Sequence, residues 1–302
     1  MFGIAALLIV IGHSQDFVRA ILPERIVDLI GYGGIGVTMF AFLSGVGLWQ
    51  SLERNNDTIC FYKKRVRRVV LPYLLISAVF YLYFYMEIHK SIVQFIADLS
   101  LVSYWMQGRG AWFVAWIIPV YLIYPLYAKI AHKHSWISLI VAASIILVIS
   151  ISGIPKRFES AAGATIAFFI GDFMARYIKE DRKWCLLAMG VLVFTAPVYM
   201  LGIIRSQSMY ISLFAGVGMS LCSIFTVLLR CVPNVLRRIL QRIGQVSLEC
   251  YLMNVYLITV ARHLFSAQIN TGFGFVIYLM VSILGIYLSL LIGKMRKRVR
   301  ST

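Results

Sequence analysis

A histidine inside the first apolar segment of the chain is the first residue that could carry chemistry. His13 follows the apolar run that begins at Gly3, and at about 1.5 Å per helical residue it lies roughly 15 Å along that helix. Ionisable groups inside a bilayer are costly and therefore mark functional sites. Asp16 lies three residues later on nearly the same face and could hold the imidazole tautomer and stabilise the protonated ring. The pair predicts general-base catalysis; the structural alternative is a histidine at a helix end that packs through one hydrogen bond.

Two arginines could bind a phosphorylated molecule. Arg65 and Arg68 lie in the run FYKKRVRRVVLPY, just before a proline, and a spacing of three residues places them on one helix face. Guanidinium groups bind phosphate oxygens through paired hydrogen bonds, so the pair predicts a phosphorylated cosubstrate on the cytoplasmic side. The alternative is a topology signal, which needs only several positive charges.

Four further residues are candidates for contacting a substrate. Ser44 lies in the stretch FAFLSGVG, whose small residues also favour close helix packing. Trp112 begins the run WFVAW, and aromatic residues at the start of a span also form the interfacial belt. Glu249 and Asn254 lie in IGQVSLECYLMN. Glu249 could instead pair with Arg242 or cap a helix start, whereas Asn254 is deeper and needs hydrogen-bond partners.

Other polar residues within the apolar runs favour structural roles. Asp172 is expected to pair with Arg176, one helical turn later. The cysteines have no close pair and no metal-ligand spacing with histidine, which predicts small buried side chains and no metal site. They are Cys60, Cys185, Cys222, Cys231 and Cys250.

The elements that carry these residues are predicted to span a membrane. Of the 302 residues, 61% are hydrophobic and only 14% are charged, whereas soluble domains are usually about half apolar and about a quarter charged. The apolar content extends over the whole length, which predicts a single membrane domain over residues 1–302. The net charge of +17 is gathered in short loops between apolar runs, which is typical of membrane topology rather than of nucleic-acid binding.

The apolar runs predict an all-α polytopic membrane protein with about ten spans. Basic residues place the loop 52–68 and the tail in the cytoplasm, and the alternation of spans then puts both ends of the chain there. The segment 91–106 alternates polar and apolar residues around Asp98, which predicts an interfacial or re-entrant segment. The predicted spans cover residues 3–18, 32–51, 69–88, 112–128, 136–152, 161–178, 184–203, 209–229, 246–265 and 273–293.

Several of these stretches, in this order, resemble the membrane-bound acyltransferase 3 family, whose members O-acylate cell-surface sugars and related acceptors. The resemblance extends over nearly the whole chain. Each motif is loose alone, but together and on matching helices they are specific. They are GIAALLIVIGHS, FAFLSGVGL, RVRRVVLPY, WFVAWIIPVYLIYPL and IGQVSLECYL.

The resemblance implies an acyl-CoA donor, commonly acetyl-CoA, used from the cytoplasmic side, with no permanently bound cofactor. It implies an essential histidine at His13 and donor-binding arginines at Arg65 and Arg68. The implied partners are a carbohydrate or lipid-linked sugar acceptor and membrane lipid, and the implied location is a bacterial plasma (inner) membrane. The family usually has a basic residue eleven positions before the histidine, and here that position is Phe2.

The sequence therefore predicts a membrane O-acyltransferase, with O-acetylation of an envelope polysaccharide as the expected reaction. Two alternatives stay open. A buried histidine beside a carboxylate, within many spans, would also suit a proton-coupled exporter or flippase of a lipid-linked sugar. Phe2 leaves an inactive relative of the family as the other alternative.

Overall fold

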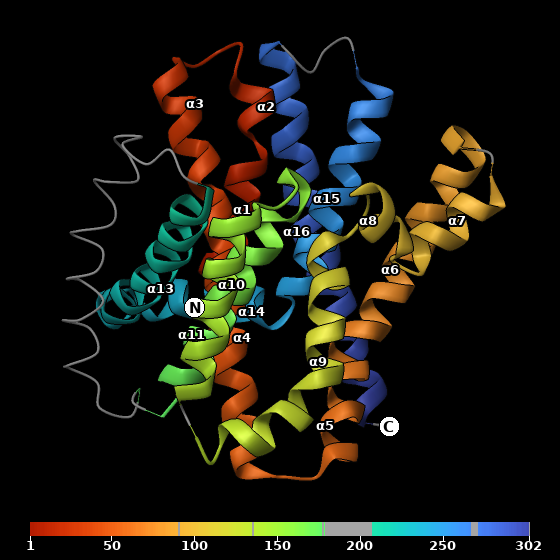
Figure 1. Cartoon of the computed structure of the whole chain (residues 1–302). Helices are drawn as coiled ribbons and strands as arrows, with labels where there is room; N and C mark the ends of the chain where they lie inside the picture. The colour runs from red at the N-terminus through yellow and green to blue at the C-terminus, as the bar shows by residue number, and fades with distance from the viewer. Residues whose placement is uncertain (90, 135, 177, 179–206, 267–270, 302) are drawn as a thin grey trace. The chain divides into compact units, whose positions relative to one another are not determined.

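The computed structural model describes the whole chain except residues 90, 135, 177, 179–206, 267–270 and 302. All regular elements in the described residues are helices, and no strand occurs among them (Figure 1). This confirms the predicted all-α class. Its physical basis is that a helix satisfies every backbone polar group within one segment, as a bilayer requires.

Five of the described helical segments are long and apolar enough to cross a membrane, and a bent pair of helices raises the number to six. The predicted span 184–203 lies outside the described residues. The total of about ten spans and their orientation stay predictions. The five segments are Glu24–Arg54, Thr58–Glu87, Trp112–Ala131, Tyr210–Cys231 and Gly272–Arg296, and the bent pair joins Asn234–Gln245 to Ser247–Leu264.

The chain divides into two compact units, each built from segments that are far apart in the sequence. Unit 1 contains Met1–Gly36, Arg67–Ala111 and Asn234–Thr302, and unit 2 contains Val37–Val66 and Trp112–Pro233. The prediction of one domain over residues 1–302 stays a prediction. Each unit is described by itself below.

Unit 1 contains the first and the last helices of the chain. Its helices α15 and α16 run side by side, and α7 lies beside both α6 and α8 (Figure 1). A cluster of Val10, Phe17, Ile258 and Tyr278 forms a core between α1, α2, α15 and α16. The helices are α1 (Phe2–His13), α2 (Gln15–Val18), α3 (Glu24–Gly31), α6 (Leu71–Phe84), α7 (Ile92–Leu99), α8 (Val102–Gln107), α14 (Asn234–Gln245), α15 (Ser247–Leu264) and α16 (Gly272–Ser301).

The segment predicted to be interfacial or re-entrant forms the two short helices α7 and α8. Each is far shorter than the about 20 residues that a spanning helix needs. Leu101 separates them in a left-handed backbone conformation with φ 67°. The Tyr73 hydroxyl of α6 donates to the backbone oxygens of Asp98 and Leu99, at 3.1 Å each, and so fixes the end of α7.

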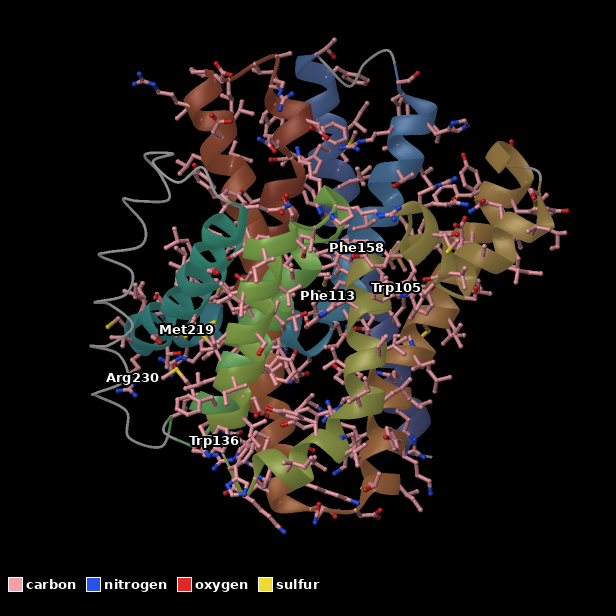
Figure 2. The ribbon with its side chains drawn as sticks, viewed as in Figure 1. Trp105, Phe113, Trp136, Phe158, Met219 and Arg230 are labelled. Carbon is pink, nitrogen blue, oxygen red and sulfur yellow. The ribbon has the colours of Figure 1, made fainter. Side chains whose placement is uncertain are left out.

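Unit 2 packs its helices closely through small residues. The backbones of α4 and α11 approach so closely that a Cβ at Gly45 or Gly171 would overlap the carbonyl of Phe168 or Phe42. Figure 2 shows Trp136 and Phe158 at opposite ends of the neighbouring helices α10 and α11. The helices are α4 (Ile35–Arg54), α5 (Thr58–Arg65), α9 (Trp112–Ala131), α10 (Trp136–Ser152), α11 (Glu159–Met174) and α13 (Gln207–Cys231).

Candidate functional site

The break at the end of α1 positions the candidate histidine. His13 is the last residue of α1, and the Ser14 hydroxyl donates to the Ile11 carbonyl at 2.7 Å. The Ser14 N–H bonds the same carbonyl at 3.0 Å, so the Val10 carbonyl loses the donor that a continuous helix would supply. The Tyr278 hydroxyl of α16 donates to that Val10 carbonyl instead. The chain just before His13 is therefore tied to α16.

The ring of His13 is held by a residue that lies 241 positions away in the sequence. Its Nδ1 lies 2.8 Å from Oδ1 of Asn254 on α15. Asn254 is only 2% exposed, and its Nδ2 donates to the Ser282 hydroxyl of α16 at 3.2 Å. In the amide orientation of the structure, Oδ1 of Asn254 faces the ring and can only accept, so the hydrogen of neutral His13 is assigned to Nδ1. The Nε2 lone pair is then available to accept a proton, as a general base requires.

Asp16, the predicted partner of His13, bonds elsewhere. Its Oδ2 accepts from Arg262 at 2.5 Å, and both side chains are about half exposed, at 55% and 44%. In the structure the contact that orients the His13 ring is therefore made by Asn254 rather than by Asp16. The turn at Ser14 explains the difference, because it interrupts the regular helix on which the three-residue spacing was based.

A second buried network joins α6 to α15 close to Asn254 in the sequence. The Tyr256 hydroxyl lies 2.7 Å from the Ser77 hydroxyl and donates to the Tyr81 hydroxyl at 3.0 Å. All three side chains are buried. Sequence reasoning missed these residues and also Ser282, although polar side chains inside the apolar runs of α6, α15 and α16 were the available signal.

Glu249 lies in the first turn of α15 and is 2% exposed. Its Oε1 accepts from Arg296 of α16 at 2.5 Å. Of the structural alternatives for Glu249, an ion pair does form, but with Arg296 rather than with Arg242. This pair ties the start of α15 to the end of α16, and the substrate-binding role of Glu249 stays a prediction.

The two predicted phosphate-binding arginines differ in their surroundings. The guanidinium of Arg65, in unit 2, lies over the rings of Phe61 and Tyr121, at 5.0 and 5.4 Å from the ring centroids. Arg68, in unit 1, is exposed and lies in the π-helical turn Val66–Val70. A proline follows at position 72, and because it has no N–H it cannot bond the carbonyl four residues earlier, a change of pattern that π turns accommodate.

The remaining predicted residues, Ser44 and Trp112, belong to unit 2 and are half-buried. The Trp112 ring meets the Phe113 ring edge to face, with centroids 5.9 Å apart. The predicted pairing of Asp172 with Arg176 is replaced as well. Asp172 is fully buried and accepts hydrogen bonds from the hydroxyls of Tyr124 and Ser138, the latter at 2.9 Å.

An open cavity of about 610 Å³ lies in unit 2 where α4 and α9 end. Beside it, the His132 ring stacks on Trp49 with centroids 3.5 Å apart, and the Arg176 guanidinium lies over Trp49 at 3.9 Å from its centroid. Burial and then the charge of Arg176 lower the pKa of His132 below its ordinary value of 6.5, while Glu53 opposes the shift. The cavity is lined by Leu52, Glu53, Asn56, Ala128, Lys129, His132 and Lys133.

Within unit 1 the structure brings His13 and Asn254 together, whereas Asp16 and Glu249 bond to Arg262 and Arg296. Among the residues that the structure describes, no three His, Cys, Asp or Glu side chains come close enough to hold a metal ion.

The family resemblance predicted from the sequence is confirmed by comparison with known families. A family profile described as an acyltransferase domain matches residues 3–294, a range that contains every predicted site residue. No match was found among curated proteins or among solved structures. With the apolar helices described above, the profile match indicates a multi-pass membrane acyltransferase. The chain belongs to the acyltransferase 3 family.

Proposed function

We propose that the protein is a membrane O-acyltransferase of a bacterial plasma membrane. It transfers an acyl group from cytoplasmic acyl-CoA to a hydroxyl of a cell-envelope saccharide or a similar acceptor. The expected acyl group is acetyl. The observation that carries the proposal is the contact of His13 Nδ1 with Asn254 Oδ1, which leaves Nε2 as the proton acceptor. Membership of the acyltransferase 3 family supports the reaction class.

In the proposed reaction His13 acts as a general base. Its Nε2 takes the proton of the acceptor hydroxyl while the hydroxyl oxygen attacks the thioester carbonyl of acyl-CoA. The new C–O bond forms, the C–S bond breaks, and the CoA thiolate takes the proton back from the imidazolium. Such a base typically contributes about 10²–10⁴-fold to the rate. The alternative route forms an acyl-histidine intermediate at Nε2 before the hydroxyl attacks.

Asn254 supports either route because its amide oxygen accepts from the Nδ1–H of His13. That hydrogen bond strengthens when the ring becomes cationic, since bonds to charged groups are stronger. Ser282 in turn receives a hydrogen bond from Asn254 and fixes the direction of the amide. Asn254 is therefore proposed as a positioning residue for His13.

The donor is proposed to contact Arg65 and Arg68 through its phosphate groups. The exposure of Arg68 supports this role, because its guanidinium is open to a ligand. The donor is proposed to bind from the cytoplasm because the predicted orientation, with about ten spans, places the basic loop 52–68 and both ends of the chain on that side. The acceptor hydroxyl is proposed to approach His13 from the outer side.

The test measures thioester consumption and acyl transfer by the purified protein in lipid vesicles. Acetyl-CoA and an extract of envelope saccharides are supplied, and the His13→Ala variant is compared at matched amounts. His263→Ala is the control, because His263 is an exposed histidine in the same unit. We expect His13→Ala to lose about 10²–10⁴-fold in rate and His263→Ala to keep it.

Full activity in folded His13→Ala would refute the assignment of the base. A wild-type protein that consumes no thioester, but moves a lipid-linked sugar in response to a proton gradient, would favour the exporter or flippase instead.

A further inference from the structure

Helix α14 has a basic side and an apolar side. With 100° between successive residues, Val235, Ile239 and Leu236 follow one another around the helix, and Arg242 and Arg238 border them next to Val235. All five are exposed. Arg238 and Arg242 are four residues apart and therefore neighbours on the helix surface. Exposed apolar residues beside two arginines are typical of a helix that lies in a membrane interface.

The depth of α14 follows from its contacts with α16. Val246, at the junction of α14 and α15, packs so closely on Gly293 that a Cβ there would lie 2.5 Å from Cγ1 of Val246. The Gln245 carbonyl accepts from Arg296 at 3.4 Å. The junction thus lies where the apolar part of α16 ends and its basic residues, beginning with Lys294, follow. This is the level at which a spanning helix leaves the hydrocarbon region.

The direction of α14 follows from the bend at the same junction. The axes of α14 and α15 meet at 73°. Helix α15 has 18 residues, so it is about 27 Å long, close to the thickness of the hydrocarbon core. If α15 crosses the bilayer, α14 therefore runs close to the membrane plane.

One edge of the apolar side of α14 is covered by α1. Gly3 lies so close to the Leu240 backbone that a Cβ would overlap its carbonyl, and Gly244 approaches the backbone nitrogen of Gly3. Ile243 is buried. The other apolar edge and the two arginines are exposed, so the surface available to a ligand combines hydrocarbon and positive charge.

We propose that this surface of α14 binds an anionic phospholipid. The phosphate and headgroup oxygens are bound by Arg238 and Arg242. The acyl chains, near the headgroup, contact Val235, Leu236 and Ile239. The charge of the helix selects the lipid class, because each arginine near a membrane surface favours anionic over neutral lipid by about fivefold. The bound lipid lies beside the start of α1, the helix that carries His13.

The test counts lipids bound to the purified full-length protein by native mass spectrometry. Phosphatidylglycerol and phosphatidylcholine with identical acyl chains are the probes. We expect the wild type to prefer phosphatidylglycerol. The ratio of bound phosphatidylglycerol to bound phosphatidylcholine should fall about 25-fold in Arg238→Gln/Arg242→Gln, because each arginine contributes about fivefold. The Arg238→Lys/Arg242→Lys variant keeps most of the preference, and added salt reduces it in the wild type.

The matched control is Lys156→Gln/Arg157→Gln, which removes the same charge from unit 2 and is expected to leave the preference unchanged. If the double glutamine variant of α14 fails to fold, the two single variants give the answer. An unchanged preference in folded variants would overturn the proposal, as would an equal loss in the control. Displacement of phosphatidylglycerol by acetyl-CoA would also overturn it, because the arginines would then serve the donor. The readout is independent of acyl transfer, so its failure is distinct from failure of the proposed function.

Discussion

Replacing Asn254 by leucine tests the orienting contact of His13 most directly. The substitution keeps the size of the side chain but removes the amide oxygen that accepts from Nδ1 at 2.8 Å. The neutral ring is then free to carry its hydrogen on Nε2, where it cannot accept a proton. Because Asn254 is buried and bonds both His13 and Ser282, the substitution also costs about 1–3 kcal/mol of stability, and the variant must be compared at equal amounts of folded protein.

The size of the effect follows from the change in charge during proton transfer. A hydrogen bond between neutral groups contributes about 0.5–1.5 kcal/mol, and one to a charged group contributes about 1.5–3 kcal/mol. The contact with Asn254 therefore strengthens by about 1–2 kcal/mol when the His13 ring becomes cationic. Since about 1.4 kcal/mol corresponds to a factor of ten, Asn254→Leu should slow acyl transfer about five- to thirtyfold.

The assay compares transfer rates at saturating acetyl-CoA in vesicles that contain equal amounts of folded protein. Ser282→Ala removes only the hydroxyl that accepts from the Asn254 amide, and it should lower the transfer rate by less than about fivefold. Asp16→Asn should also cost less than about fivefold, because its carboxylate pairs with an exposed arginine. Wild-type activity in Asn254→Leu, or a larger loss in Asp16→Asn than in Asn254→Leu, would refute the reasoning.

Two further predictions concern unit 2. Gly171→Leu should destabilise the fold by about 1–3 kcal/mol or more, because its side chain overlaps the α4 backbone, whereas Gly47→Ala, with no atom within 4 Å, should be tolerated. Thermal unfolding of the two purified variants measures this, and equal midpoints would contradict it. Because the pKa of His132 is lowered in the folded protein, His132 of the unfolded chain takes up its proton at a higher pH than His132 of the folded protein does. Acidification through about 6.5 therefore favours the unfolded chain and should destabilise the wild type. His132→Gln should show a weaker dependence in the same melts, and an identical dependence would contradict the assignment.

The helical class and the location of the histidine on an apolar helix were predictable from the sequence. A long run such as the one before His13 can satisfy its backbone in a bilayer only as a helix. The stretch FAFLSGVG likewise predicted close packing, and Gly45 does lie against the backbone of a neighbouring helix. These features depend on residues that are local in the sequence.

The partners of the buried polar groups were not predictable in the same way. Asp16 and Asp172 were predicted to pair with His13 and Arg176, and Arg242 was one alternative partner for Glu249, because helix periodicity relates only residues close in the chain. In the structure their partners lie on other helices, and His13 is held by Asn254, 241 positions away. Such contacts depend on which helices pack together, and a single sequence does not encode that in any local pattern.

Two hydrogen bonds of α16, one to α1 directly and one through Asn254 of α15, also relate the position of His13 to α16. Tyr278 bonds the backbone just before His13, and Ser282 supports the amide that holds its ring. These two residues are four positions apart and therefore lie on one face of α16. A sliding of α16 along its own axis would carry both attachments by the same amount, whereas a rotation would swing both away from α1 and α15. A movement of this one face of α16 is therefore expected to change the position of His13.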